Sequence, residues 1–384
     1  MFPKKPSRLY ASFIGALLPL LSISQYTPIP TNIFNDASNH WYHISDKKNT
    51  IQPLPNQPRY QPSDITAIAD NILLFQHNNG GWPKNYDMLA VLTPEQQELV
   101  KLSKSEEHTT FDNRTTYSHI SYLAQVYTTT HIEKYKEAVL HGLRFILDAQ
   151  YNNGGWPQYY PLEKGYSRHI TYNDDAMAGI MDLLKNILDN QPTYSFVDDS
   201  FRKRLQKSFD KGLDCILKTQ INDTGTPTVW CQQHDEVTLQ PAWARAFEPP
   251  CICNGESVKI VQFLMSISHP SPEVVKAVQN AVAWFQASKI TGITIQTIQA
   301  AADTSQYTVS HVDKIVVRDS SAPPIWTRYY ELKTHRPMFC NRDSKIVYSL
   351  AEVQRERRVG YAWYTYEPQK VLDKYDNWLK KIKQ

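Results

Sequence analysis

Apolar residues recur with a helical spacing along most of the chain from residue 63 onward. The segment 132–150 is typical, because Leu143, Ile146 and Ala149 fall on one stripe of a helix with about 3.6 residues per turn. Pro272 precedes another such segment, at a first helical turn where a missing N–H costs nothing. The pattern predicts an opening helix and then three pairs of helices, at 62–76, at 115–129 with 132–150, at 174–188 with 201–220, and at 257–267 with 273–289.

One phrase returns within this helical region. The sequence ILLFQHNNGGWPKNYD at 72–87 comes back as ILDAQYNNGGWPQYYP at 146–161, with weaker echoes at 216–232 and 283–293. Each copy holds a glutamine, and the separations are 74, 70 and 66 residues (150−76, 220−150 and 286−220): Gln76, Gln150, Gln220 and Gln286. This period fits two helices of about 20 residues with their loops. The fold class is therefore expected to be mainly α, an α/α toroid of helical hairpins whose long loops meet at one mouth.

The pattern changes after residue 292. The stretches 293–299 and 308–319 alternate apolar and polar residues, as β-strands do, and prolines follow them. The stretch 326–350 mixes strand-like and loop residues around several arginines, and 373–383 reads as a short amphipathic helix. We expect a small β and loop cap on the toroid and no second domain, because this part is too short and too charged for a core of its own.

The N-terminus reads as a secretory signal. Lys4, Lys5 and Arg8 precede an apolar run at 10–21, and small residues then allow cleavage near Gln25. The run is too short for a membrane-spanning helix, although a membrane-anchored N-terminus is the alternative. The expected organisation is a signal peptide at 1–24, a flexible lead-in at 25–61 and a catalytic domain at 62–384. A secreted or periplasmic protein without a stable membrane span follows from this organisation.

Composition narrows the class of protein. Of 384 residues, 41% are hydrophobic and 21% charged, which is typical of a globular chain. The net charge of +3 and the lack of a long Lys/Arg block argue against a nucleic-acid partner. The aromatic content, with 23 Tyr and nine Trp, suits sugar rings and ordinary cores equally well. Five cysteines allow at most two disulfides, and their spacing gives no zinc site.

Two acidic stretches stand at the starts of predicted helices. Asp112 and Asn113 precede the first helical pair, and Asp174 and Asp175 follow Asn173 at the start of the second. An Asp or Asn there is also a good N-cap, which is the ordinary structural explanation. Two adjacent carboxylates exceed what one cap needs, however, and both stretches should reach the same mouth of the toroid. Carboxylate and amide oxygens gathered in this way suit Ca²⁺, at an open site and not at an EF-hand loop.

A basic group completes the candidate chemistry. Arg245 lies among aromatic residues in the polar stretch 229–257, where the ordinary explanation is an ion pair with Asp235, Glu236 or Glu248. Arg328 and Arg342 follow in the cap, and each arginine alone could likewise be a surface ion pair. Arginine binds carboxylates through paired, charge-assisted hydrogen bonds. Together with a calcium site, the three arginines predict a cleft for a polyanion.

These motifs carry a family resemblance. TTFDN, the repeated NNGGWP, TYNDDAM, QPAWARAFEPP, WTRYYEL and FCNRD, in this order between about 61 and 366, resemble the pectate lyases of polysaccharide lyase family ten. The resemblance implies a partly closed, incomplete α/α toroid. It implies Arg245 as the Brønsted base, and Arg328 and Arg342 as ligands of the substrate carboxylate. Asp112, Asn113 and Asp174 correspond to positions associated with Ca²⁺ and that carboxylate, and Asp175, beside them, is assigned to substrate binding.

The implied activity is calcium-dependent cleavage of α-1,4-linked polygalacturonate by anti β-elimination, which gives 4,5-unsaturated oligogalacturonides, by a monomeric enzyme. Ca²⁺ and the two cap arginines would neutralise the C6 carboxylate, so that Arg245 can remove the C5 proton. Burial beside Trp243 and Phe247 should lower the pKa of Arg245. Two other classes stay open from the residues alone. One is a toroidal glycoside hydrolase that uses Asp112 with Asp174 or Asp175, and the other is a carbohydrate-binding protein without turnover.

Overall fold

The computed structural model describes residues 26–44, 46, 49–306 and 308–383. The predicted signal peptide at 1–24 lies outside the described residues. No helix within these described ranges is long and apolar enough to cross a membrane.

Seven predicted helices are confirmed to within three residues at each end, the helix predicted at 373–383 begins six residues earlier, and the described residues contain three more. The helices are α1 Asn35–His43, α2 Ile65–Phe75, α3 Pro94–Ser103, α4 Tyr117–Thr130, α5 Glu133–Ala149, α6 Ala176–Leu188, α7 Asp199–Thr219, α8 Asn254–Ser266, α9 Pro272–Ser288, α10 Arg355–Gly360 and α11 Glu367–Ile382. Short 3₁₀ turns lie between them, at η1 Asn32–Phe34, η2 Asp112–Arg114, η3 Tyr166–Arg168, η4 Asn173–Asp175, η5 Pro192–Tyr194 and η6 Leu350–Glu352.

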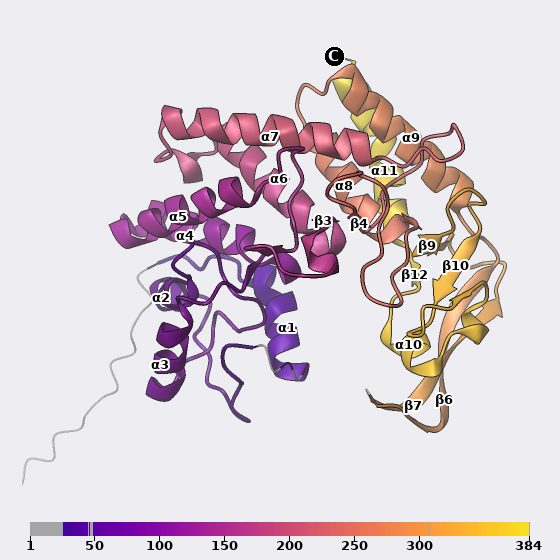
Figure 1. The fold of residues 1–384 in the computed structure, drawn as a ribbon, viewed down its shortest axis with the longest axis horizontal. Helices are drawn as coiled ribbons and strands as arrows, with labels where there is room; N and C mark the ends of the chain where they lie inside the picture. Colours follow the sequence, from indigo (N-terminus) through magenta and orange to yellow (C-terminus); the bar gives the residue numbers. More distant parts are fainter. Residues whose placement is uncertain (1–25, 45, 47–48, 307, 384) are drawn as a thin grey trace, which may run out of the picture.

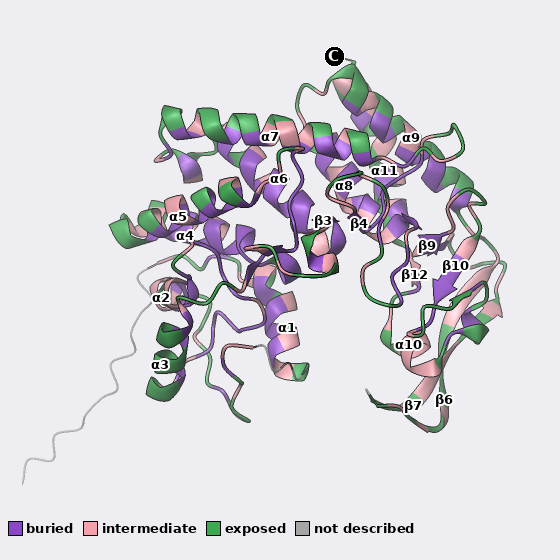
Figure 2. Cartoon of the chain, in the orientation of Figure 1, coloured by how far each residue is buried: buried purple, intermediate pink, exposed green. Residues whose placement is uncertain are grey.

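The helices form an incomplete α/α toroid (Figure 1). The hairpins α4–α5, α6–α7 and α8–α9 follow one another, with α4, α6 and α8 in contact as an inner row. The inner α6 is apolar over most of its surface, and nine of its 13 residues are buried. The outer α7 buries only one stripe and shows its other faces to solvent (Figure 2). This division follows from the sequence, because a helix that is apolar on all sides needs cover on all sides.

The repeated glutamines have a structural role that explains the repeat. The Gln76 side-chain amide donates to the carbonyls of Gly80, in its own loop, and of Ala138, in the next hairpin, both at 3.0 Å. Gln150 makes the equivalent pair of bonds, to Gly154 at 3.0 Å and Ser208 at 2.9 Å. Gln220 does the same with Thr228 and Ala277, both at 2.9 Å. Each glutamine therefore ties the loop of one hairpin to the outer helix of the next.

The tryptophans of the repeat form a second set of equivalent bonds. The indole N–H groups of four buried tryptophans each donate to a carbonyl at or near the end of the preceding helix, at 2.7 to 2.8 Å: Trp82 to Ile72, Trp156 to Ile146, Trp230 to Ile216, and Trp326 to Phe285. The fourth echo thus keeps the tryptophan bond, although its glutamine, Gln286, bonds only to Lys289 within the described hydrogen bonds.

Glycine is required where these loops approach the next hairpin. Gly154 has φ +94, and a Cβ there would lie 1.9 Å from the carbonyl oxygen of Lys211. The equivalent Gly80 has φ +93 and would meet His141 in the same way. Both conformations and both contacts exclude a side chain.

The predicted strands after residue 292 are confirmed as an antiparallel hairpin of β6 Ile293–Thr304 and β7 Val309–Arg318, with a register shift between Gln299 and Asp303. It extends from the toroid beside α10 (Figure 1). The other strands are short: β1 Thr109–Thr110, β2 Tyr159–Tyr160, β3 Ile170–Thr171, β4 Gln233–His234, β5 Ile252–Cys253, β8 Trp326–Thr327, β9 Tyr329–Tyr330, β10 Pro337–Cys340, β11 Ile346–Val347 and β12 Tyr364–Thr365. One small sheet, in the order β11-β10-β9-β5, joins the cap to the toroid.

The segment before residue 62 differs from the expected flexible lead-in. It contains η1 and α1, and Phe34, Ala37, Ser38 and Trp41 are buried. These residues follow the i, i+3, i+4, i+7 spacing of a helix that packs on one side, and the Trp41 indole donates to the carbonyl of Ile51 at 2.9 Å. The segment therefore belongs to the folded body. The five cysteines are all buried thiols, and no disulfide forms among them.

Candidate active site

The two acidic stretches come together as predicted, at equivalent positions of two successive repeats. Asp112 and Asn113 lie in η2 before α4, and Asp174 lies in η4 before α6, and the two turns are in contact. Asn113 and Asp174 have left-handed backbones, with φ of 50 and 52. Neither stretch acts as a simple cap. The N-cap of α4 is Thr116, whose N–H donates to His119 Nδ1, and Asp175 makes no side-chain capping bond to α6. The capping explanation therefore does not account for these carboxylates.

Asp112 is buried, and only one of its two carboxylate oxygens has a hydrogen-bond partner among the described residues. Lys84 Nζ lies 2.6 Å from its Oδ2, while its Oδ1 has no hydrogen-bond partner within the described part of the chain. Burial acts to raise the pKa of Asp112, but the Lys84 ammonium outweighs it and the pKa is lowered. Gln158 also stabilises the ionised form. Lys84 and Gln158 each follow the GGWP of one repeat, so the repeat delivers both partners to one carboxylate.

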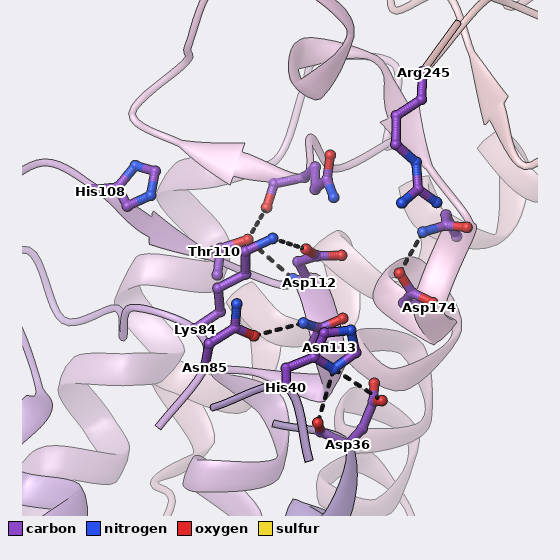
Figure 3. Close-up of polar contacts among 12 residues, drawn as sticks. Asp36, His40, Lys84, Asn85, His108, Thr110, Asp112, Asn113, Asp174 and Arg245 are labelled. Carbon is purple, nitrogen blue, oxygen red and sulfur yellow. Dashed lines mark hydrogen bonds and ion pairs between the residues drawn. The ribbon is translucent and has the colours of Figure 1, made fainter. Parts of the chain in front are cut away.

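Asp174, unlike Asp112, forms no ion pair with a cationic side chain of the described residues. Its pKa is raised well above the usual range, first by burial and then by the charges of Asp112 and Glu256. It accepts a short hydrogen bond from Asn173, and among the described residues it has no ion pair within 4 Å. Figure 3 shows Asp112, Asn113 and Asp174 facing the same space.

These oxygens fit a hard cation. Asn113 donates its amide nitrogen to Asn85 at 2.7 Å, which leaves its amide oxygen for a ligand. Asp112 Oδ1 is buried without a hydrogen-bond partner among the described residues, and the partly buried Asp174 has no ion pair there, so a bound Ca²⁺ would satisfy both carboxylates. The described residues also place His169, Asp235 and Glu236 within metal-binding distance of one another, but this group contains none of the predicted ligands.

Arg245 points toward Asp174 from the loop between β4 and β5 (Figure 3). Its partner is Glu248, one of the three carboxylates considered from the sequence. The guanidinium binds both Glu248 oxygens, with Nε to Oε2 at 2.7 Å, and lies 5.0 Å from the centroid of Phe247. Of the aromatic neighbours, Phe247 and Trp230 are buried, but Trp243 is 42% exposed.

The expected lowering of the Arg245 pKa is wrong for this structure. Burial does act to lower it, but the ion pair with Glu248 outweighs burial and the pKa is raised. Glu248 is itself buried and also accepts a bond from the Tyr361 hydroxyl at 2.9 Å, so its charge is held close to Arg245. The sequence showed the aromatic neighbours, but not which carboxylate would pair with the guanidinium.

Arg328 and Arg342 reach the site from the cap, each paired with a glutamate, and the partner of Arg342 also binds Arg357 at 2.7 Å. Arg328 is mostly buried, pairs with Glu256 at the start of α8, and lies 4.7 Å from the centroid of Tyr361. The pKa of Glu256 is raised to about 7, mainly by burial. Arg342 binds Glu356 through two bonds of 2.8 and 2.9 Å, and lies 5.1 Å from the Phe247 centroid.

Phe247 gathers the basic side chains. Arg245, Arg342 and Arg357 lie 5.0, 5.1 and 4.7 Å from its ring centroid. The charge of Arg328 acts to lower the pKa of Asp174, although burial outweighs it and the pKa is raised. The predicted acidic and basic groups therefore share one site. Asp175 lies one step away and pairs with Arg114 at 3.0 Å.

Sequence reasoning missed several partners in this site: Lys84, Arg114, Gln158, Glu256, Glu356, Arg357 and Tyr361. Lys84 and Gln158 could have been found, since they occupy the same position of a repeat that was recognised.

Comparisons with known proteins agree with this geometry. The family model for pectic acid lyase matches residues 76–372. Among solved structures, a mutant of the family 10 polysaccharide lyase from Cellvibrio cellulosa, in complex with trigalacturonic acid, is similar with 30% identity and a TM-score of 0.69, covering 90% of this chain and 96% of that one. Another structure of the family 10 lyase from Cellvibrio cellulosa is similar with 32% identity and a TM-score of 0.68, covering 81% and 91%. A search of the curated proteins gave no match.

The family model covers well over half of the chain, and the fold, the repeats and the ordered motifs are consistent along its length. The chain therefore belongs to the pectic acid lyase family, within family ten of the polysaccharide lyases, and is a polysaccharide lyase.

Proposed function

We propose that this lyase cleaves α-1,4-linked polygalacturonate by calcium-dependent anti β-elimination and releases 4,5-unsaturated oligogalacturonides. The observation that carries the proposal is the pair of the buried Asp112 and the partly buried Asp174 with Arg245 directed at it (Figure 3). A base beside a cation site is the arrangement that proton removal next to a carboxylate requires. The similar lyase in complex with trigalacturonic acid supports the same substrate class.

In this proposal Asp112, Asn113 and Asp174 hold Ca²⁺. Bound there, the cation would act as a Lewis acid on the substrate carboxylate and stabilise the negative charge that develops on it. Arg328 and Arg342 orient the same carboxylate and add positive charge around it. To do so, they must exchange part of their bonding to Glu256 and Glu356 for the substrate.

Arg245 is the proposed base that takes the C5 proton, anti to the leaving C4 oxygen. It acts only as the neutral guanidine, and the Glu248 ion pair makes that form rarer by raising its pKa. Activity should therefore rise with pH into the alkaline range. The hydroxyl of Tyr361 and the guanidinium share Glu248, so a shift of Glu248 toward Tyr361 would release Arg245 for proton transfer.

The decisive assay follows the ultraviolet absorbance of the unsaturated product. Polygalacturonate with added calcium should give a rising signal, which chelation abolishes and calcium restores. New reducing ends without ultraviolet absorbance would instead indicate a hydrolase, and retention on pectate without turnover would indicate a binding protein. We further propose a secreted or periplasmic monomer, whose catalytic domain includes the N-terminal segment with α1 in addition to the expected 62–384.

A further inference from the structure

A cavity of about 630 Å³ lies next to the candidate active site. One wall comes from the N-terminal segment, through Asn32, Asn35, Asp36 and Asn39. Its other walls include Asp174, Asp175, Glu256 and Arg328, together with Arg114, Gly255 and the stretch 362–367. The cavity therefore continues the catalytic site past Asp174 and Arg328, toward residues that the family model, which begins at 76, does not include.

Arg114 has an unusual backbone for its type. Its φ is 60, in the left-handed region that favours glycine, and a side chain there costs about 1 kcal/mol. Non-glycine residues with this backbone conformation cluster at functional sites, where the side chain makes a contact that glycine cannot make. The Arg114 side chain is 49% exposed and reaches the cavity, where its Nη2 lies 3.0 Å from Oδ2 of Asp175.

Asp175 orients the Arg114 guanidinium and leaves most of its N–H donors available. The bond to Asp175 engages one nitrogen, and the Arg114 guanidinium makes no further hydrogen bond to the described residues. A guanidinium has five N–H donors in a planar fork, so a second carboxylate can bind the free edge. Asp175 also has a left-handed backbone, with φ 61, which directs its carboxylate at Arg114 and away from α6.

The N-terminal wall offers the groups that recognise sugar hydroxyls. Asn35 and Asn39 each carry both a donor and an acceptor, and Asp36 adds acceptors. Asp36 is fixed in place by His40, whose Nδ1 lies 3.4 Å from the Asp36 carboxylate and 2.9 Å from its carbonyl (Figure 3). Phe34 and Trp41 anchor this wall in the core, so the polar side chains are held at the cavity.

We propose that Arg114 and the N-terminal wall form a subsite for the galacturonate unit next to the one that reacts, with Arg114 binding its carboxylate and Asn35, Asp36 and Asn39 its hydroxyls. This inference rests on the proposed function. The charges restrict where that carboxylate can bind, since five carboxylates and only two arginines line the cavity. Arg328 is assigned to the carboxylate of the reacting unit, so the free edge of Arg114 is the place that can accept the neighbouring carboxylate without a bound cation.

The test compares Arg114→Gly with Lys333→Gly. Lys333 is also an exposed cation with a left-handed backbone, φ 67, and does not line the cavity. Both changes remove one positive charge and relieve the same backbone strain, so neither should lower Tm. Arg114→Gly should raise the KM for polygalacturonate about tenfold with kcat within about twofold, while Lys333→Gly leaves both unchanged. Arg114→Lys, which keeps the charge and loses the fork, should fall between wild type and Arg114→Gly.

Equal KM values for Arg114→Gly and Lys333→Gly would overturn the subsite. If Arg114→Gly unfolds, Arg114→Lys and Asn39→Ala decide, and an unchanged KM in both overturns it. A wild-type protein that makes no unsaturated product refutes the proposed function instead. In that case calorimetric titration with trigalacturonate tests the subsite directly. Weaker binding by Arg114→Gly than by wild type is expected, and equal affinities would overturn the subsite.

Discussion

The two sides of the active site carry their charges differently. On the toroid side, Asp112 keeps one oxygen without a partner and Asp174 has no counter-ion among the described residues. On the other side every arginine already has a glutamate, in the pairs Arg245–Glu248, Arg328–Glu256 and Arg342–Glu356. The carboxylate side is therefore stabilised by gaining a cation, whereas the arginine side can accept a substrate carboxylate only by exchange. Each side can be perturbed separately.

The largest effect is expected from Arg245 itself. Arg245→Ala should lower kcat on polygalacturonate by about 10²–10⁴-fold, because it removes the proposed base. Tm should fall, because the buried Glu248 carboxylate loses its ion-pair partner and keeps only the bond from the Tyr361 hydroxyl, so kcat is compared well below the Tm of the variant. Arg204→Ala, an exposed arginine on α7, serves as the control and should behave as wild type. Retention of activity within about tenfold by Arg245→Ala would remove Arg245 from the chemistry.

The carboxylate side is tested by a pair of isosteric changes with opposite expected signs. Asp174→Asn removes a partly buried carboxyl group that no ion pair stabilises, and should stabilise the calcium-free protein by about 1 kcal/mol at pH 8. Asp112→Asn leaves the Lys84 ammonium without its partner, and should destabilise it by about 1–3 kcal/mol. Thermal unfolding in EDTA gives both values.

Both variants should also lose the rise in Tm that calcium produces in the wild type, since each removes a ligand. If the two changes shifted Tm in the same direction in EDTA, the assigned difference between the two carboxylates would be incorrect.

The arginine side is tested through Glu248. Glu248→Gln removes the charge that raises the pKa of Arg245, so the alkaline rise of kcat should move to lower pH by about one unit. Glu248→Asp keeps the charge and should shift the profile less. The pH profiles of the three proteins provide the measurement, and a shift to higher pH in Glu248→Gln would contradict the role given to this ion pair.

A smaller effect is expected on stability in acid, from histidines buried below the site. Burial lowers the pKa of His119 to about 3 and that of His234 to about 4, from 6.5 when unfolded. The unfolded chain then binds more protons, so stability is full above about pH 6.5 and falls toward pH 4, by up to about 3 kcal/mol per histidine. His119→Gln should flatten this dependence in denaturation curves measured between pH 7 and 4. An unchanged slope would show that other groups control it.

Most of the helical fold could be predicted, because the apolar period is strong and the repeat is nearly identical in its first two copies. Helix α3 was missed although Thr93 and Gln96 form a capping box, and α1 was missed because prolines and polar residues around it resemble a linker. The apolar stripe from Phe34 to Trp41 does indicate a helix. The stripe is short, however, and no second helix lies nearby in the sequence to form a hairpin with it.

The sequence was sufficient to predict which residues form the site, but not the direction in which their pKa values shift. Asp112, Asp174, Arg245 and Arg328 are conspicuous in the sequence and do meet. Which glutamate faces which arginine depends on contacts between distant segments, such as Arg328 with Glu256, 72 residues apart. Ion pairing decides the sign of a pKa shift, so the sequence suggested a lowered pKa for Arg245 where the structure gives a raised one.

The tryptophan bonds have a consequence for where the chain can change length. The interval between the carbonyl and the indole is ten residues in the first two copies, 14 in the third and 41 in the fourth, yet all four bonds form. The fourth interval contains the whole β6–β7 hairpin, and its two ends are joined by the bridge between Ile290 and Ile325. The hairpin therefore leaves and rejoins the toroid at one point, three residues before Arg328. It is also held at α10, where Arg358 binds Asp313 at 2.7 Å, so a change of length that keeps both attachments should leave Arg328 and Glu356 in place.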